Sequence, residues 1–286
     1  MHRTAEHLRR DPTTRLGELG RQRPEWRTWL AMLNEVAGAL DDPRWQTPLP
    51  EAAPADSSTE AEPAAPLLHS RRLQVDGGAA QDLVRGLASR AAGALGRYRP
   101  SARDAVELIT AAVRQDSAQI GALASAAAVE SGALSSAAHL ATLPLLQSCG
   151  RLLESRLPRY WPHGYCPVCA AWPTLVERRG LDRSRQLRCG RCAVEWENQG
   201  LRCVYCGERD HRQLGTLVPE GEGEVLKVEI CHTCSGYLKS VATLQRIPPI
   251  ELLLRDLETV ELDLVAGDRG YGRPERAGFP LEVGAA

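Results

Sequence analysis

The stretch 161-WPHGYCPVC-169 decides the fold of the C-terminal half, because it places two cysteines on one tight turn, two residues apart. Eight of the nine cysteines fall into four pairs with this spacing. The pairs are Cys166 with Cys169, Cys189 with Cys192, Cys203 with Cys206, and Cys231 with Cys234. A two-residue gap lets both thiolates face one ion, and two such turns complete a closed tetrahedral site. The sequence therefore predicts two metal sites, each built from four cysteines.

The order in which the four turns combine stays open at this point. Taken sequentially, they give C-x2-C-x19-C-x2-C and C-x2-C-x24-C-x2-C, the first within the zinc-ribbon range and the second slightly longer. A cross-braced arrangement, first turn with third and second with fourth, uses the same residues. Four thiolates suit zinc and a rubredoxin-type iron equally well. In the plainest interpretation the metals only hold the fold, since a structural zinc contributes on the order of 10 kcal/mol of folding energy.

Several residues near the four turns are interpreted as supporting rather than ligating. Cys149 lies among leucines and is expected to be a small buried hydrophobic residue. With eight cysteines available, His163 and His232 are expected to be bystanders or hydrogen-bond partners and not ligands. Four aromatic residues are expected to pack around the sites: Trp161, Tyr165, Trp196 and Tyr237.

Upstream of residue 158 the pattern is helical. Apolar residues recur at helical spacing from Pro24 to Leu40, from Ala79 to about Arg97, and again in alanine-rich stretches at 117–129 and 132–157, where Pro144 should break the helix. Ser101 and Asp104 resemble a capping box at the start of another helix. Residues 46–78, rich in proline and small or acidic residues, are expected to be a flexible linker or loop.

Downstream, short β-prone stretches alternate with cysteine-bearing turns. Strands are expected at 174–177, 186–188, 193–197 and 225–230, and a final helix after Pro248-Pro249. The predicted fold class is α+β: an all-helical domain at 1–158, a first four-cysteine ribbon at 159–202, a second at 203–246, and a C-terminal helix and tail at 247–286. The two ribbons are expected to be tandem rubredoxin-like or zinc-ribbon modules.

Composition narrows the functional classes. The formal net charge is −1 over 286 residues, so there is no overall electrostatic case for binding nucleic acid or a membrane surface. The first residues carry charges throughout and do not resemble a secretory signal, and no window is apolar enough for a spanning helix. These features predict a cytoplasmic location without membrane insertion, where cysteines are more often thiols and metal ligands than disulfides.

The segment 160–286 resembles the formate dehydrogenase accessory proteins of the FdhE family. The resemblance rests on the order and spacing of five stretches: 161-WPHGYCPVC-169, 187-LRC-189 followed by 192-CAVEW-196, 203-CVYC-206, 231-CHTCSGYLK-239, and the run from Asp256-Leu257 to Leu262-Asp263 ending near Gly270-Tyr271. The N-terminal half matches more thinly, through Pro24-Glu25-Trp26. The chain departs from the family pattern in four places: Ala170 for a usual glycine, Gly200 for a usual arginine, Arg255-Asp256 for an acidic pair, and 277-AGFP-280 for the usual Asn-Pro-Phe ending. The departures leave the eight cysteines in place and concern contacts with a partner.

The resemblance implies an assembly factor and not an enzyme. Such a protein would bind the catalytic, molybdenum-containing subunit of a respiratory formate dehydrogenase and assist its assembly or activation before export. The ribbons would then be a docking surface or a redox-sensitive iron centre. A second alternative is that the protein assists a subunit of a different metalloenzyme in the same way. The oligomeric state is not predicted.

Two other functions compete with this one. Nucleic-acid binding, the alternative, is supported by the stretch 178–191, which holds six arginines against one acid. Pairing of these arginines with Glu177, Glu195 and Glu197 is the plainer interpretation. An enzyme is disfavoured, because a dithiol catalyst offers one exposed low-pKa pair and a hydrolytic zinc keeps an open ligand position.

Overall fold

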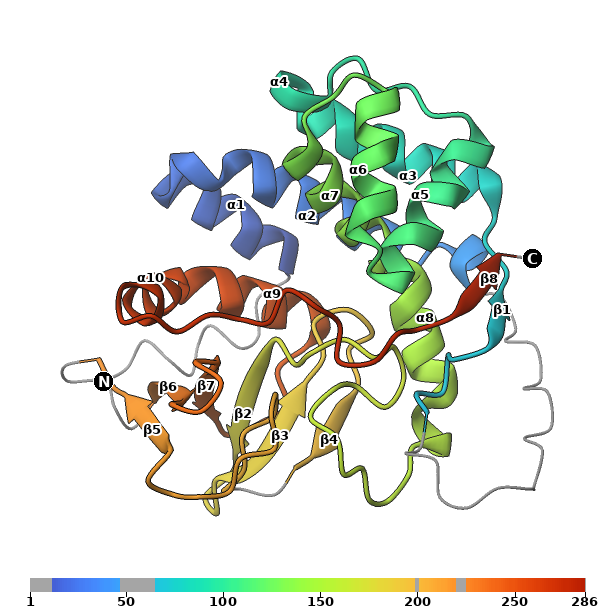
Figure 1. The fold of residues 1–286 in the computed structure, drawn as a ribbon. Helices are drawn as coiled ribbons and strands as arrows, with labels where there is room; N and C mark the ends of the chain where they lie inside the picture. Colours follow the sequence, from blue (N-terminus) through green and yellow to red (C-terminus); the bar gives the residue numbers. More distant parts are fainter. Residues whose placement is uncertain (1–11, 47–64, 199–200, 220–224, 286) are drawn as a thin grey trace, which may run out of the picture. The chain divides into compact units, whose positions relative to one another are not determined.

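The computed structural model describes residues 12–46, 65–198, 201–219 and 225–285, which form two compact units. Within the described residues, the first unit comprises 12–46, 70–148 and 283–285, and the second comprises 65–69 and 149–282. Figure 1 shows the helices of the first unit and the sheet of the second. Among the residues that the structure describes, no helix has both the length and the apolar character needed to cross a membrane.

The first unit is a helical bundle with a two-stranded parallel sheet. Its core consists of leucine, isoleucine and alanine side chains at helical spacing, among them Leu33, Leu87, Leu108, Ile109 and Leu134, all fully buried. Its helices are α1 (Pro12–Gln22), α2 (Arg27–Ala39), α3 (Gly77–Arg90), α4 (Ala92–Leu95), α5 (Ala102–Arg114), α6 (Ser117–Ala126) and α7 (Ser131–Ala141). Its strands are β1 (Arg71–Leu73) and β8 (Val283–Ala285), and they pair in parallel.

Local signals fix the helix ends. The expected capping box is present at the start of α5, where Asp104 N–H donates to the Ser101 hydroxyl and Ser101 N–H donates to the Asp104 carboxylate. Asp76 caps α3 by accepting from the Ala79 N–H at 2.7 Å. The expected break near Pro144 is also present, since α7 ends at Ala141 and α8 (Leu143–Leu153) begins afresh.

The linker expected at 46–78 is only partly described. Residues 47–64 lie outside the described part of the chain. Residues 65–78 differ from the expected flexible loop, because Leu68 is fully buried, β1 pairs with the C-terminal strand β8, and α3 already begins at Gly77. The pairing of β1 with β8 also means that the last described residues are part of the first unit rather than a tail of the second.

The second unit is built on one six-stranded sheet, in the order β4-β3-β2-β7-β6-β5. The strands are β2 (Leu175–Arg179), β3 (Ser184–Arg188), β4 (Glu195–Glu197), β5 (Leu214–Leu217), β6 (Leu226–Cys231) and β7 (Tyr237–Thr243). Neighbouring strands are antiparallel except β2 and β7, which run parallel with Val176 opposite Ser240. The two predicted ribbons are therefore present, but their strands join into one continuous sheet.

Two helices, α9 (Pro249–Glu258) and α10 (Val260–Asp268), lie along this sheet (Figure 1). Leu252 of α9 packs with Leu175 and Val241, and Ala266 of α10 packs with Val228 and Tyr237. The single final helix expected from the sequence is thus two helices. It is interrupted at Thr259, whose hydroxyl donates to the Arg255 carbonyl at 2.7 Å.

The border between the units falls inside α8, near residue 148, rather than at 158. From Cys149 onward this helix packs on the first ribbon: a Cβ added at Gly150 would clash with the carbonyl oxygen of Cys192. The predicted mixed helix and sheet class, with a helical N-terminal region, is confirmed.

Candidate metal centres

The structure brings the eight paired cysteines together in two groups of four. Cys166, Cys169, Cys189 and Cys192 form the first centre, and Cys203, Cys206, Cys231 and Cys234 form the second. Within each group the sulfur atoms all lie within 4.8 Å of one another. The grouping is the sequential one, first turn with second and third with fourth, and not the cross-braced one.

The four cysteine turns share one backbone geometry. In each turn the N–H of the first cysteine donates to the carbonyl of the residue five positions later, as from Cys166 to Ala171 at 2.8 Å and from Cys231 to Gly236 at 2.9 Å. The residue after the second cysteine is left-handed in all four turns: Ala170 (φ 62°), Ala193 (φ 62°), Gly207 (φ 78°) and Ser235 (φ 51°). This reversal turns the chain back so that both sulfurs of a pair face the same side.

The sulfur positions fit a tetrahedral metal ion. Zn–S bonds of about 2.3 Å place the four sulfurs of a tetrahedral site about 3.8 Å apart. Cys203 Sγ lies 3.7 Å from Cys234 Sγ, and Cys206 Sγ lies 3.7 Å from Cys231 Sγ. In the first centre the cross-turn distances are 3.4 Å and 3.5 Å, and the Val168 N–H donates to Cys166 Sγ. Each group can therefore hold one metal ion.

The two centres differ in exposure. All four cysteines of the first centre are buried, and three of them are fully inaccessible. In the second centre Cys203 and Cys231 are buried, whereas Cys206 and Cys234 are exposed. The second centre is therefore more open to solvent than the first.

The pKa values of the thiols show why a cation belongs in the first centre. Burial raises the pKa values of Cys166 and Cys192 well above the ordinary thiol value, whereas hydrogen bonds from Cys166 and the other two thiols lower that of Cys169. Without a cation, burial therefore opposes ionisation of Cys166 and Cys192. A bound divalent ion removes this penalty and is needed to ionise the whole set.

A series of aromatic contacts runs from residues beside the first cysteine turn to Tyr205 of the third turn. Trp161, His163 and Tyr165 form a cluster in which the rings of His163 and Tyr165 stack at 4.7 Å. Trp172 contacts Tyr165 at 6.1 Å and Tyr205 at 5.1 Å, and Tyr205 lies inside the third cysteine turn. Trp172 and Tyr205 were not among the aromatic residues expected at the sites, although both lie within three residues of a metal-site cysteine.

His163 and His232 are not members of the two cysteine groups. The Nε2 of His163 is buried, while His232 Nδ1 shares a 2.9 Å hydrogen bond with the Tyr271 hydroxyl. Cys149 is buried on α8 and belongs to neither group. Gly164, between His163 and Tyr165, allows a close approach of the second ribbon, since a Cβ there would clash with the Val204 carbonyl.

A second feature that the sequence analysis missed is a buried ion-pair network beside the second centre. Lys239 is fully buried on β7, and its Nζ lies 2.8 Å from Asp256 Oδ1 and 2.7 Å from Asp263 Oδ2. Arg273 Nη2 also contacts both carboxylates, at 2.8 Å and 3.0 Å. The available signal was the 237-YLK-239 stretch after the last cysteine turn, together with the acidic positions of the final helices.

The arginine-rich stretch 178–191 is largely engaged by carboxylates. Arg188 is fully buried against Glu177, and Arg179 contacts Glu195 at 2.7 Å. Arg185 contacts Glu229 of the second ribbon at 2.7 Å. Pairing with Glu177 and Glu195 was expected, whereas Glu197 instead accepts from the Gln186 side chain. This stretch is therefore not a free basic stripe.

Comparison with known proteins supports the resemblance drawn from the sequence. Residues 201–279 match the family model described as FdhE, C-terminal domain. A "Protein FdhE homolog" of Stutzerimonas stutzeri is 40% identical over 111 residues, which span 38% of this chain and 35% of that protein. A homologue of the same name from Aquifex aeolicus is 28% identical over 122 residues, 41% of each chain. The chain thus aligns over well under half the length of these relatives.

The fold comparison covers the whole chain. The crystal structure of the FdhE protein from Pseudomonas aeruginosa matches with a TM-score of 0.55 and 23% sequence identity, over 99% of both chains. At this identity the match shows similarity of fold. Together, the family model, the relatives and the fold confirm the resemblance to the FdhE family.

Proposed function

We propose, from the resemblance to the FdhE family, that this chain is a formate dehydrogenase accessory protein that binds the catalytic subunit of a respiratory enzyme. In this role it assists assembly or activation of that subunit in the cytoplasm, before export. The observation that carries the proposal is the pair of four-cysteine centres on one sheet, in a chain whose fold is similar to an FdhE protein.

The proposal assigns the eight cysteines as metal ligands and gives them no catalytic step. Four thiolates occupy all four coordination positions of a tetrahedral ion and leave none for substrate or water. This argues for a structural or docking role. Zinc and iron both fit four sulfurs. Cys189→Ser should remove one of two bound ions per chain, whereas Cys149→Ser, outside both centres, should retain two. Two ions in the Cys189→Ser protein would contradict the ligand assignment.

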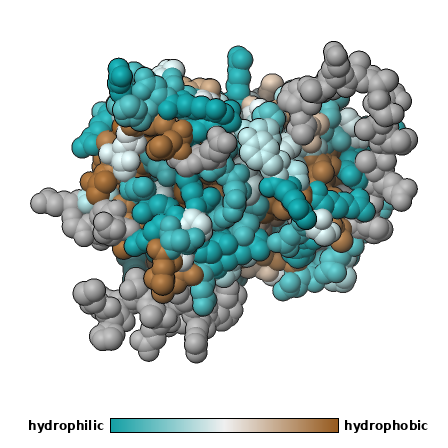
Figure 2. All heavy atoms as spheres, turned by 90° about the horizontal axis from the view of Figure 1, so that it is seen from below, coloured by the Kyte–Doolittle hydropathy of each residue, from teal (hydrophilic) through white to brown (hydrophobic). Residues whose placement is uncertain are grey.

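Nucleic-acid binding is less well supported than partner binding. Arg179, Arg185 and Arg188 are committed to carboxylates of the same unit, so phosphate would have to displace existing ion pairs. On the face shown in Figure 2, hydrophobic side chains form separate patches among hydrophilic ones.

The test is anaerobic co-purification of the full chain with a formate dehydrogenase catalytic subunit, together with metal analysis and an absorption spectrum. We expect two ions per chain and a complex that survives gel filtration. Thiolate-to-iron charge-transfer bands would assign iron, and their absence with two zinc ions would assign zinc. Retention on DNA at physiological salt, without a complex, would overturn the proposal in favour of nucleic-acid binding.

A further inference from the structure

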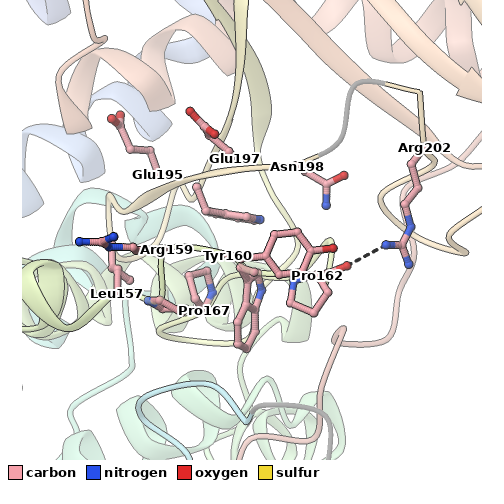
Figure 3. A pocket seen from close by; sticks show the side chains of 12 residues that line it. Leu157, Arg159, Tyr160, Pro162, Pro167, Glu195, Glu197, Asn198 and Arg202 are labelled. Atoms are coloured by element: carbon pink, nitrogen blue, oxygen red, sulfur yellow. Dashed lines mark hydrogen bonds between the residues drawn. The ribbon is translucent and has the colours of Figure 1, made fainter.

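A pocket of about 250 Å³ opens in the second unit, between the connection that follows α8 and the end of β4. We call it the aromatic pocket. Three aromatic and three proline residues provide most of its wall: Tyr160, Trp161, Trp196, Pro158, Pro162 and Pro167. In Figure 3, Arg159 and Arg202 lie at opposite ends, with Tyr160 and Pro162 between them. The Tyr160 side chain is accessible from solvent, since the residue is 63% exposed.

Two buried polar atoms of the pocket lining have no hydrogen-bond partner among the residues that the structure describes. Of the two indoles, that of Trp161 donates to the Tyr165 carbonyl at 2.6 Å, but the Nε1 of Trp196 is unpaired although the residue is 94% buried. The Asn198 amide donates through Nδ2 to the His163 carbonyl, and its Oδ1 is unpaired. An unpaired buried donor or acceptor is unfavourable, because it has lost its hydrogen bonds to water without a replacement. The pocket thus holds one unused donor and one unused acceptor.

The pocket lining holds two arginines and two glutamates, and one of the glutamates is already paired with arginines outside the lining. Arg202 donates from Nη1 to the Pro162 carbonyl at 2.9 Å, and neither Arg202 nor Arg159 forms an ion pair with a described residue. Of the two acids in the lining, Glu195 is already neutralised by Arg179 at 2.7 Å and Arg246 at 3.0 Å. Glu197 is exposed and accepts from Gln186. A ligand with negative charge therefore matches the two ends of the pocket.

We propose that the aromatic pocket is a docking site for an extended, acidic peptide segment of a partner protein. A peptide group supplies one carbonyl for the Trp196 indole and one N–H for the Asn198 oxygen. Aromatic and proline side chains form rigid walls against which an extended backbone can lie. Acidic side chains of the segment pair with Arg159 and Arg202. The volume lies below the ~300–1,000 Å³ typical of small-molecule sites, which fits a short part of a longer chain.

The inference goes beyond the proposed function, since it holds for whichever protein supplies the segment. Its test is selection of a phage-displayed random heptapeptide library on the immobilised full chain. The selected peptides are then measured by tryptophan fluorescence against two double variants. Tyr160→Ala with Arg159→Glu changes the pocket at exposed positions. Leu181→Ala with Arg209→Glu makes the same kinds of change at exposed positions outside the pocket lining.

We expect enrichment of peptides with aspartate or glutamate, which bind the pocket variant at least tenfold more weakly and the control variant unchanged. Their affinity should fall at 0.5 M NaCl, because salt screens exposed charge pairs. No enrichment, enrichment of peptides without acids, or equal weakening in both variants would overturn the proposal. So would binding of ATP or inorganic phosphate, lost in the pocket variant, in place of peptide binding. Unchanged thermal unfolding of both variants confirms that they fold.

Discussion

Lys239 Nζ lies 2.7 Å from Asp263 Oδ2, in an ion pair that ties the central strand β7 to helix α10. The lysine side chain is fully buried, while Asp263 and Asp256 are partly exposed. The 237-YLK-239 stretch, the most specific part of the family resemblance, thus has a structural role. Tyr237 donates to Asp263 at 2.7 Å, and Lys239 holds Asp256 and Asp263 together.

Replacing this lysine should destabilise the second unit. Lys239→Met keeps the length of the side chain but leaves Asp256 and Asp263 with Arg273 as the remaining cation. Removing one partner of a buried ion pair lowers the free energy of unfolding by about 3–5 kcal/mol. Because Arg273 remains and both carboxylates are partly exposed, we expect a loss near the lower end of this range. Urea unfolding of the metal-loaded chain measures it. Arg269→Met, at an exposed position directly after α10, is the control and should change stability by less than about 0.5 kcal/mol. Equal effects of the two substitutions would contradict the role of Lys239.

Restoring the glycine usual in the family at residue 170 should stabilise the first centre. Ala170 has φ 62°, a conformation that costs a residue with a Cβ about 1–2 kcal/mol. The lost methyl is buried and offsets about 0.8 kcal/mol of this gain, so Ala170→Gly should raise the free energy of unfolding by about 0.5 kcal/mol. Ala171→Gly, at a buried neighbour without a positive φ, should lower it. Thermal unfolding compares the two, and destabilisation by Ala170→Gly would show that packing outweighs strain.

The difference in exposure between the centres predicts two rates of metal loss. A chelator should remove one ion per chain quickly, from the second centre with its exposed Cys206 and Cys234, and one slowly from the buried first centre. A chromophoric chelator added to the metal-loaded chain follows both phases. Cys206→Ser should abolish the fast phase and Cys169→Ser the slow one. A single phase that carries two ions would show that exposure does not control release.

Protonation of His163 should weaken the fold on acidification. Burial, with the nearby Arg202 charge, lowers the pKa of His163 below its ordinary value near 6.5. At a pH between the folded and the unfolded pKa of His163, the histidine is protonated in the unfolded chain but neutral in the folded one. The free energy of unfolding therefore rises with pH, and the contribution of His163 is fully present above about pH 6.5. It is lost as the pH falls toward the folded pKa. His163→Phe, which keeps the stacking on Tyr165, should reduce the slope of unfolding free energy against pH between pH 7 and 5. An unchanged slope would show that groups other than His163 cause the pH dependence of stability.

The local features of this fold could be predicted from the sequence. The spacing of the cysteines predicted two four-cysteine groups but left the order of pairing open, helical periodicity predicted most of the bundle, and Ser101 marked the start of α5. Each of these signals lies within a few residues, where backbone geometry and side-chain capping act directly.

The long-range features could not be predicted. Strand β7 is buried along five of its seven residues and contains a lysine, so it lacks the alternation that marks a half-exposed strand. Its parallel pairing with β2 joins residues more than sixty positions apart and leaves no local signal. The unpaired Trp196 and Asn198 atoms were hidden for the same reason, since their surroundings come from separate segments.

Because β2 and β7 pair in parallel, the second ribbon is not expected to fold as an independent domain. A fragment that starts at residue 201 would retain β5, β6 and β7 but lose β2, and the inner flank of β7 would become a bare sheet edge. Such an edge pairs readily with another chain. Excised ribbons should therefore self-associate, and their two ion sites are best regarded as one cooperative folding block.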